Sequence, residues 1–357
     1  MRLLLVGYMF GFGGVQTHTH YLATGLTLRG HEVIVMTPPR MDASEGELPS
    51  ARNYRLEVYN GVSDAFKGWP IVSRDLDAVV VCGTGWKAMI GSLRLPERAK
   101  RIFFEVMSGK RSSFVDPRLL IHFGFDAIVG QARPVEAQFR REFFWSGPST
   151  AIPALPEPPE LFSTVPPYQP QVNSDGSLRF AYFGRLVPHK GLVFLIENWG
   201  RFAPPGSTLD VFGTGSDEAV ARRCVEERGL AKAISFHGKY PTGAGFVSLA
   251  QKFDLKLLPT VGEEGAPLVL LEAMACGLPF VANGVGGIPD YANPDCRITD
   301  GDINEFIPAV RGQILAMRKG LIKSDRLQDF YKQNFSFEAL VGRWEAFLDN
   351  VIGDGFK

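Results

Sequence analysis

Short apolar runs alternate with longer segments of helical periodicity in both halves of the chain. The first run, 2–6, is followed by a glycine-bearing loop and by Val15, Leu22 and Leu26 at near-helical spacing. A second apolar run at 31–36 completes a strand, helix, strand unit. Similar runs follow at 78–82, 101–106 and 126–130. The pattern predicts a parallel sheet with helices on both faces.

The pattern breaks between 147 and 176, where eight prolines lie close together. Prolines at this density interrupt helices and central strands alike. The alternation then resumes at 178–184 and continues to the end of the chain. We therefore predict an α/β chain of two doubly wound, Rossmann-like domains. The expected division is an N-terminal domain at 1–150, a linker at 151–176, a C-terminal domain at 177–336 and an amphipathic helix at 337–352 that packs on either domain.

The composition argues against several classes of protein. Lys and Arg number 38 and so do Asp and Glu, which disfavours a chain-wide grip on nucleic acid. The four cysteines contain no C-x-x-C pair, so a reduced cytoplasmic protein is favoured over a zinc or dithiol protein. No stretch approaches the roughly 20 apolar residues of a membrane span. Any membrane contact is therefore expected to be peripheral.

Glycines crowd the first loop without the spacing of a dinucleotide-binding motif. The loop does not follow G-x-G-x-x-G, and the second strand ends at Met36 and Thr37 with no carboxylate for a ribose. A nicotinamide enzyme is therefore not predicted. Gly13 and Gly14 stand at a helix N-terminus, where exposed amides can meet an anion. A tight turn that needs positive φ explains the two glycines equally well.

The second half carries two groups of candidate residues. Arg185 and Lys190 lie in a loop after an apolar strand, where α/β folds bind ligands and where two cations suit a diphosphate. A solvated surface is the plain alternative for them. Glu264 and Glu272 flank the start of an apolar helix, about two turns apart. The apolar neighbours of Glu272 favour a carboxylate that accepts hydrogen bonds, for instance from a ribose diol.

The segments GRLVPHKG, VFGTGS, EGAPLVLLEAMACGLP and VGGIPD, in this order and spacing, resemble a retaining GT-B glycosyltransferase of family 4. The N-terminal GGVQTHTHYLATGLTLRGHEVIVMT is similar to the opening of that family. The resemblance covers nearly the whole chain. It implies two Rossmann-like domains facing a cleft, a nucleotide-diphosphate sugar as donor, no separate cofactor and no essential metal. A UDP- or GDP-linked donor is favoured over an ADP-linked one.

Carried over residue by residue, the resemblance implies a role for each candidate. Arg185 and Lys190 neutralise the leaving diphosphate, Glu264 contacts the transferred sugar, and Glu272 holds the ribose. The N-terminus of the helix at Pro267, Leu268 and Val269 meets phosphate and sugar, Gly238 and Tyr240 belong to the base-binding segment, and Gly13 and Gly14 approach the donor phosphate. Gln16, His18 and Ser108 are expected on the acceptor side. Retention in this family is described as front-face attack, which requires no protein nucleophile.

The chain departs from the family pattern near the sugar. Ser108 or Met107 stands where many members carry a histidine, and EGAP replaces EGFG. For His18, a position on the surface of the first helix is the favoured interpretation, and reach toward the acceptor is the alternative. The pairs Asp75 with Asp77 and Asp300 with Asp302 form D-x-D motifs. Caps or strand edges are predicted for them rather than a metal site.

The predicted function is retaining transfer of a sugar to an acceptor hydroxyl, in glycan, glycolipid or glycoconjugate biosynthesis. A GT-B phosphorylase or epimerase and a non-catalytic nucleotide-sugar-binding subunit stay open as alternatives. Residues 1–150 hold 18 Lys and Arg against 14 Asp and Glu. This excess suggests an anionic acceptor or peripheral contact with the inner membrane leaflet, with evenly solvated helices as the plain alternative.

Overall fold

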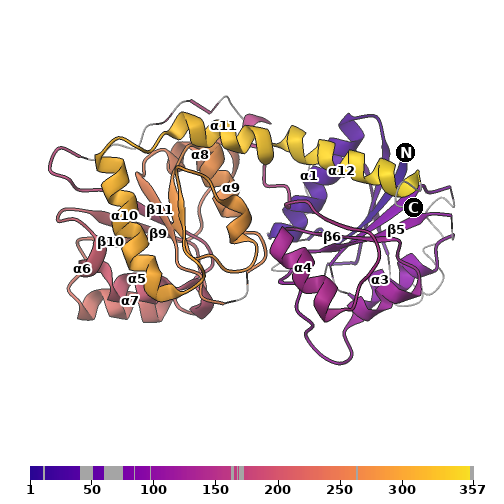
Figure 1. Cartoon of the computed structure of the whole chain (residues 1–357), viewed down its shortest axis with the longest axis horizontal. Coiled ribbons are helices and arrows are strands. Elements are labelled where there is room, and N and C mark those ends of the chain that lie inside the picture. Colours follow the sequence, from indigo (N-terminus) through magenta and orange to yellow (C-terminus); the bar gives the residue numbers. More distant parts are fainter. Residues whose placement is uncertain are drawn as a thin grey trace. The chain divides into compact units, whose positions relative to one another are not determined.

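The chain folds into two compact units. The computed structural model describes residues 1–10, 13–40, 51–59, 75–83, 85–96, 98–161, 165–166, 168, 173–262 and 264–353. One unit contains Met1–Pro156 with Phe337–Lys357, and the other contains Glu157–Ser336. Each unit is a parallel sheet with helices packed against it (Figure 1). The expected linker spans this division, and its residues 162–164, 167 and 169–172 lie outside the described residues.

The first unit is built on a sheet of seven described strands in the order β3-β2-β1-β4-β5-β6-β7, and all of its pairs are parallel. Its strands are β1 (Arg2–Val6), β2 (Glu32–Thr37), β3 (Arg55–Val58), β4 (Ala78–Cys82), β5 (Lys100–Glu105), β6 (Ala127–Gly130) and β7 (Ser149–Ala151). Its helices are α1 (Gly14–Leu28), α3 (Trp86–Leu93), η1 (Pro117–Phe123), α4 (Arg133–Glu142) and α12 (Phe337–Ile352). Strands covered on both faces read as continuous apolar runs, which is why the pattern predicted them.

The second unit repeats the architecture with six described strands in the order β10-β9-β8-β11-β12-β13. They are β8 (Arg179–Phe183), β9 (Thr208–Phe212), β10 (Ile234–Phe236), β11 (Leu255–Leu258), β12 (Phe280–Ala282) and β13 (Arg297–Ile298). The longer helices are α5 (Leu192–Glu197), α7 (Glu218–Glu227), α8 (Gly243–Ala250), α9 (Leu268–Ala275), α10 (Phe306–Arg318) and α11 (Ser324–Asn334). Shorter turns are η2 (Pro159–Leu161), η3 (Pro188–Lys190), α6 (Trp199–Phe202), η4 (Ile288–Tyr291) and η5 (Ile303–Glu305). The predicted doubly wound α/β fold is confirmed.

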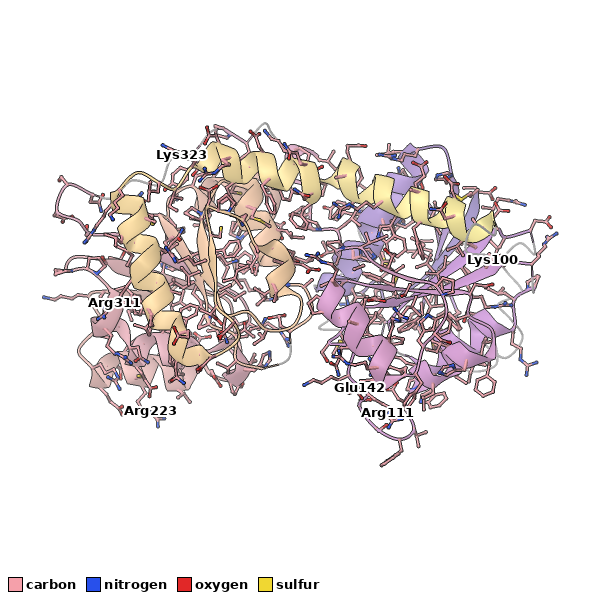
Figure 2. The ribbon with its side chains drawn as sticks, viewed as in Figure 1. Lys100, Arg111, Glu142, Arg223, Arg311 and Lys323 are labelled. Carbon is pink, nitrogen blue, oxygen red and sulfur yellow. The ribbon has the colours of Figure 1, made fainter. Side chains whose placement is uncertain are left out.

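Apolar side chains fill both units, and charged ones cover them. Arg223 of α7 and Arg311 of α10 are exposed and point outward (Figure 2). Within the described part of the chain, every helix falls short of the length and apolar character needed to cross a membrane.

The last helix, α12, returns to the first unit and lies along α1 (Figure 1). Trp344 of α12 is fully buried, and its ring lies 5.4 Å from that of Phe104. Arg29, which follows α1, donates to Glu345 at 2.7 Å and to Glu338 at 2.9 Å. A Cβ at Gly25 would lie 2.4 Å from Cγ2 of Val341. The two helices therefore approach closely because residue 25 has no side chain.

Gly25→Ala is expected to lower the free energy of unfolding by about 1 to 3 kcal/mol, because the added Cβ forces α12 away from α1. Gly200→Ala is the matched control, since a Cβ at Gly200 of α6 would meet no atom within 4 Å. Removing a helical glycine there is expected to be neutral or to stabilise by about 0.5 to 1 kcal/mol. Urea unfolding followed by tryptophan fluorescence measures both. Equal effects of the two substitutions would contradict the packing of α12 on α1.

Candidate functional site

Loops from three neighbouring strands of the second unit meet at one edge of its sheet. They begin after β8, β9 and β11, and β8 pairs in parallel with both of the others. The carboxyl ends of parallel strands face the same edge, where such sheets bind ligands. A Cβ at Gly213 would lie 1.8 Å from the Gly184 carbonyl oxygen, and one at Gly191 would lie 2.4 Å from the Pro259 carbonyl oxygen. Glycine is therefore required at both positions for the loops to approach this closely.

An ion pair joins the loop after β8 to the loop after β11. Lys190, the last residue of η3, is buried, and its Nζ contacts Oε2 of Glu264. Thr260 Oγ1 donates to the same carboxylate oxygen at 3.5 Å. Arg185 lies earlier in the first loop and is exposed. Lys190 is thus fixed by an ion pair, whereas Arg185 is in contact with solvent.

Helix α9 begins beside this ion pair. Leu268 is its first residue, Pro267 stands at its N-cap, and no side chain caps its N-terminus. Glu272 is half-buried within the helix. Burial raises the pKa of Glu272 to about 7, and the nearby Lys256 ammonium opposes that rise. Glu272 is therefore partly enclosed by the protein rather than fully extended into solvent, and the hydrogen bonds expected of its carboxylate stay a prediction.

Lys256 is the functional candidate that the sequence analysis missed. It lies in β11 and is fully buried. Its Nζ donates to the Val269 carbonyl oxygen of α9 at 2.6 Å and lies 5.7 Å from the centroid of the Phe183 ring. Burial lowers the pKa of Lys256 well below its ordinary value, whereas Glu272 opposes that change. A lysine inside an otherwise apolar strand was the available signal, because a buried ammonium requires an acceptor.

The segment expected to bind the base lies beside the same edge. Gly238 has a φ of 70°, and its carbonyl oxygen accepts from the Gly213 amide at 2.7 Å. The Tyr240 ring packs against Phe183 with 5.3 Å between centroids. Tyr240 and Glu272 both line a cavity of about 20 Å³. A larger cavity of about 650 Å³ lies along β13 and α10, and none of the predicted site residues lines it.

The aspartates of the two D-x-D motifs accept hydrogen bonds from backbone amides or form ion pairs. Asp302 caps η5 by accepting from the Asn304 amide at 2.9 Å. Asp77 accepts from the Arg2 amide at 2.7 Å, next to β4, and Asp75 pairs with Arg98. Among the described residues, no group of three or more His, Cys, Asp or Glu is placed to hold a metal ion.

The backbone at Gly13 contradicts one of the two interpretations of the glycine pair Gly13 and Gly14. Gly13 precedes α1 with a φ of 178°, which is extended backbone that any residue adopts. The interpretation as a turn that needs positive φ is therefore wrong for Gly13. Gln16 donates through Nε2 to the Phe10 carbonyl oxygen at 3.1 Å. A Cβ at Gly13 would lie 2.8 Å from Oε1 of Gln16, so the Gln16 side chain occupies that space. Gly14 is exposed at the start of the helix.

His18 is not on the surface of the first helix, and this expectation is corrected. Its side chain is fully buried, and Nδ1 accepts from the Leu155 amide at 3.1 Å. Its ring packs at a tilt against Phe104 with 4.3 Å between centroids, and the Trp344 ring of α12 lies 5.7 Å away. Burial lowers the pKa of His18 to about 3. His18 is a neutral core residue and offers no exposed atom to an acceptor.

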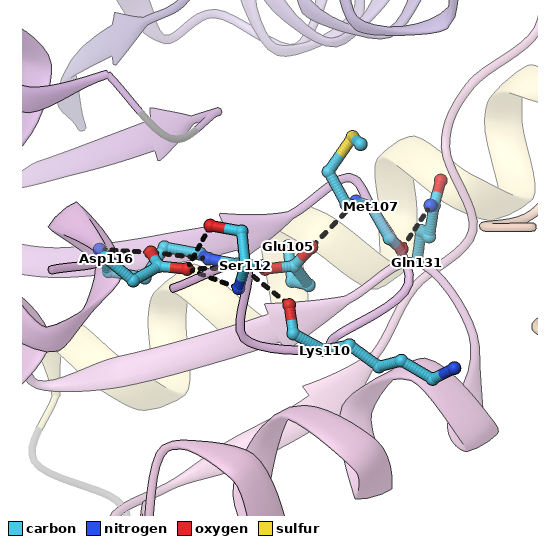
Figure 3. Close-up of polar contacts among 7 residues, drawn as sticks. Glu105, Met107, Lys110, Ser112, Asp116 and Gln131 are labelled. Carbon is cyan, nitrogen blue, oxygen red and sulfur yellow. Dashed lines mark hydrogen bonds and ion pairs between the residues drawn. The ribbon is translucent and has the colours of Figure 1, made fainter. Parts of the chain in front are cut away.

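Ser108 lies in a loop that buried charges hold in place (Figure 3). Glu105, at the end of β5, accepts from the Met107 amide at 2.7 Å and from Arg118 Nη1 at 2.9 Å. Arg118 also pairs with Asp116 at 2.7 Å and donates to the Lys110 carbonyl oxygen at 2.6 Å. Burial alone would raise the pKa of Asp116, but Arg118 and Ser112 hold it well below its ordinary range.

The network in Figure 3 lies inside the loop. Glu105, Asp116 and Arg118 are all buried, and Gln131 adds a hydrogen bond to the Met107 carbonyl oxygen at 3.0 Å. Ser108 itself is half-buried. The candidates thus fall into two groups. The basic and acidic residues and the start of α9 lie in the second unit, and Gly13, Gly14, Gln16, His18 and Ser108 lie in the first.

Comparison of the sequence with known proteins finds glycosyltransferases. Residues 177–314 match the family described as glycosyl transferases group 1. A 2-deoxystreptamine N-acetyl-D-glucosaminyltransferase from Streptomyces fradiae is 30% identical over 173 residues, which are 46% of this chain and 38% of the relative. A GDP-mannose-dependent α-(1-6)-phosphatidylinositol monomannoside mannosyltransferase from Mycolicibacterium smegmatis is 24% identical over 336 residues, 85% of this chain and 86% of the relative.

Comparison of the structures finds the same fold over nearly the whole chain. The Anabaena protein HepE in complex with UDP has a TM-score of 0.77 at 17% identity, covering 98% of this chain and 100% of HepE. The apo lipopolysaccharide outer core galactosyltransferase WaaB has a TM-score of 0.73 at 18% identity, covering 99% and 100%. The GT-B fold that the motifs implied is confirmed by these likenesses.

Lys256→Met is expected to raise the pKa of Glu272 further, because the carboxylate stays buried and loses the cation that offsets its burial. The Glu272 carboxyl group should therefore take up its proton at higher pH in the variant than in the parent. Carbon NMR titration of ¹³C-glutamate-labelled protein measures this, with Glu272→Gln assigning the signal. Leu257→Met is the matched control in the same strand and leaves the titration unchanged. A Glu272 titration that is the same with and without Lys256 would contradict the pairing.

Proposed function

We propose that this chain, a GT-B glycosyltransferase of the group 1 type, moves a sugar with retention from a UDP- or GDP-linked donor to an acceptor hydroxyl. The observation that carries the proposal is the ion pair of buried Lys190 with partly buried Glu264 beside the start of α9, where the parallel strands end. Glycosyltransferases among the relatives and a neighbour that holds UDP support a nucleotide sugar as donor.

The donor diphosphate is assigned to the basic loop and to the start of α9. The Lys190 ammonium has three N–H donors. One of them donates to Glu264, and the other two can donate to phosphate oxygens. Arg185 adds a planar guanidinium from the solvent side. The amides of Leu268 and Val269 extend the set, since a helix N-terminus favours an anion. Together these groups stabilise the negative charge that develops on the leaving diphosphate.

The two glutamates are assigned to binding. Glu264 is engaged by Lys190, whereas Glu272 feels the charge of Lys256. Glu264 then contacts a hydroxyl of the transferred sugar, and Glu272 accepts from the ribose diol. Retention follows front-face attack. The bond from the sugar to phosphate breaks, the acceptor oxygen bonds to the same face, and the departing phosphate oxygen accepts the hydroxyl proton.

The remaining candidates complete the donor and acceptor sites of the proposal. Gly238 and Tyr240 hold the base, while Gly13 and Gly14 present backbone amides to the donor phosphate. Gln16 and Ser108 are assigned to the acceptor side. His18 is left out because it is buried. The proposed reaction uses no metal and no cofactor besides the donor.

The acceptor is proposed to be anionic or lipid-linked. One relative is a phosphatidylinositol monomannoside mannosyltransferase by name, and the first 150 residues carry an excess of Lys and Arg, 18 against 14 acidic residues. We assign the chain to the cytoplasm, at the periphery of the inner leaflet, in glycolipid or glycoconjugate synthesis.

A thermal-shift panel of nucleotides and nucleotide sugars tests the donor class. UDP- or GDP-linked sugars are expected to raise the melting temperature, since a ligand at 100 times its dissociation constant stabilises by roughly 2.7 kcal/mol. ADP-glucose should shift it less. The shift is expected to shrink in Glu272→Ala, which removes the proposed ribose acceptor. No shift with any nucleotide in the parent protein would refute the donor site.

Arg185→Ala and Lys190→Ala are each expected to lower kcat by about 10² to 10³, the usual effect of removing one donor to a developing anion. Arg223→Ala, at an exposed arginine of α7, is the control and leaves kcat unchanged. Product analysis measures sugar transfer. A loss of only a few-fold in both variants would exclude the diphosphate assignment. A sugar phosphate product or an epimerised donor would instead identify a phosphorylase or epimerase, and donor binding without any turnover would identify a non-catalytic subunit.

A further inference from the structure

Four large apolar side chains stand exposed in one region of the first unit. Phe114, Val115, Phe123 and Phe144 expose 89%, 71%, 75% and 79% of their surface; we call them the apolar tip residues. Phe114 and Val115 end the loop that leads into η1, and Phe123 ends η1. His122 bonds through Nε2 to the Phe143 carbonyl oxygen at 2.7 Å, which brings the next residues, Phe123 and Phe144, near each other. Arg118 lies 4.7 Å from the Phe143 ring centroid and pairs with Asp116, the residue after Val115, so both parts adjoin the same arginine. Single exposed apolar residues are ordinary, but such a group marks an interaction surface.

Hydrogen bonds hold the loop that carries Phe114 and Val115 in a defined conformation. Asp116 accepts from the Ser112 amide at 3.1 Å, and Arg118 donates to the Lys110 carbonyl oxygen at 2.6 Å. A Cβ at Gly109 would lie 2.5 Å from the Val135 carbonyl oxygen, so the start of the loop sits directly on α4. Buried and paired charges thus hold the loop (Figure 3), while Phe114 and Val115 at its end are largely exposed.

Phe144 is exposed through an unfavourable backbone conformation. Its φ is 52°, and it is the only non-glycine residue with positive φ in the described part of the chain. Left-handed backbone is rare for a bulky residue and concentrates at functional positions. The preceding Phe143 is buried and stacks on Phe139 with 4.4 Å between centroids. The strained turn therefore buries one phenylalanine and turns the next one out to solvent.

Basic side chains surround these aromatic rings. Lys110 and Arg111 belong to the same loop, and the Arg111 guanidinium lies 5.6 Å from the Phe114 ring centroid. Arg140 and Arg141 occupy the last turn of α4. The acidic neighbours are engaged within the helix, because Glu136 pairs with Arg140 at 3.8 Å and Glu142 accepts from Gln138 at 2.9 Å. Figure 2 shows Arg111 on a loop that projects from the unit and Glu142 on α4.

We infer that the apolar tip residues insert into the surface of an anionic bilayer, while Lys110, Arg111 and Arg141 face its headgroups. Exposed aromatic and aliphatic groups beside Lys and Arg are the combination by which proteins bind in the interface of negatively charged membranes. The inference rests on the membrane contact in the proposed function and names the segment that makes it. It would hold the acceptor-side unit at the surface that contains a lipid-linked acceptor.

Flotation of the intact chain with vesicles tests the inference in the absence of nucleotide. The chain is expected to float with vesicles of phosphatidylcholine containing 30% phosphatidylglycerol and not with phosphatidylcholine alone. Phe114→Ser combined with Phe144→Asn should reduce the bound fraction at least tenfold. Asparagine is chosen because it tolerates left-handed backbone. Val220→Ser combined with Leu315→Ser is the matched control, since both residues are exposed apolar positions of the second unit.

A second pair of variants tests the charge. Arg111→Gln with Arg141→Gln should weaken flotation several-fold and reduce its dependence on salt. Arg223→Gln with Lys319→Gln removes two exposed charges from the second unit and should leave flotation unchanged. Thermal melting and the nucleotide-induced shift of melting temperature, measured without vesicles, establish that each variant is folded and binds its donor. These readouts separate a failure of the donor site from a failure of the membrane surface.

Three results would overturn the inference. The first is a parent chain that does not float with anionic vesicles at low salt. The second is flotation that the tip variants and the control variants weaken equally. The third is a parent chain that forms dimers in sedimentation velocity and becomes monomeric in the tip variants without any vesicle binding, which would assign the surface to a second copy of the chain.

Discussion

Parallel pairing of β8 with β9 and β11 is the constraint on which the candidate site depends. It brings the loops that follow these strands to one edge, although Arg185 and Glu272 are far apart in the sequence. The loop after β12 also lies against the loop that contains Glu264, since a Cβ at Gly286 would lie 1.8 Å from the Glu264 carbonyl oxygen. The backbone of Glu264 is thus held by one loop and its carboxylate by Lys190. The sheet places the residues, and the glycines set how closely they meet.

Two lysines and two glutamates at this edge have contrasting surroundings. Lys190 and Glu264 meet in a direct pair, while Lys256 is tied to the backbone of α9 and influences Glu272 through the protein interior. Lys190 and Glu264 offset each other's charge, so this pair alone supplies little net attraction for an anion. Arg185 is exposed and adds the positive charge that a diphosphate requires. A balanced buried set keeps its members in place, and an exposed arginine can move to meet the ligand.

The fold was predictable because both faces of each central strand are buried, which leaves continuous apolar runs in the sequence. The basic loop with Arg185 and Lys190 was predictable because its residues are close together in the sequence. The same holds for α9 and the loop that precedes it. Lys256 was missed because its partners lie in α9, outside its own strand. His18 was misplaced although it lies three residues after Val15 and four before Leu22, on the apolar face of α1. What the sequence did not show is its partner, because Trp344 lies more than 300 residues later. Gly13 shows that a glycine alone does not specify positive φ, since its φ is 178°.

The loop after β5 is held by charges that lie inside it. Arg118 pairs with both Glu105 and Asp116, and all three side chains are buried. Buried charges are costly unless they are paired, so this network constrains the loop strongly. A constrained loop can carry Phe114 in contact with solvent without collapsing onto the core. The buried network therefore holds the loop that contains Ser108 and also keeps Phe114 exposed on the same unit.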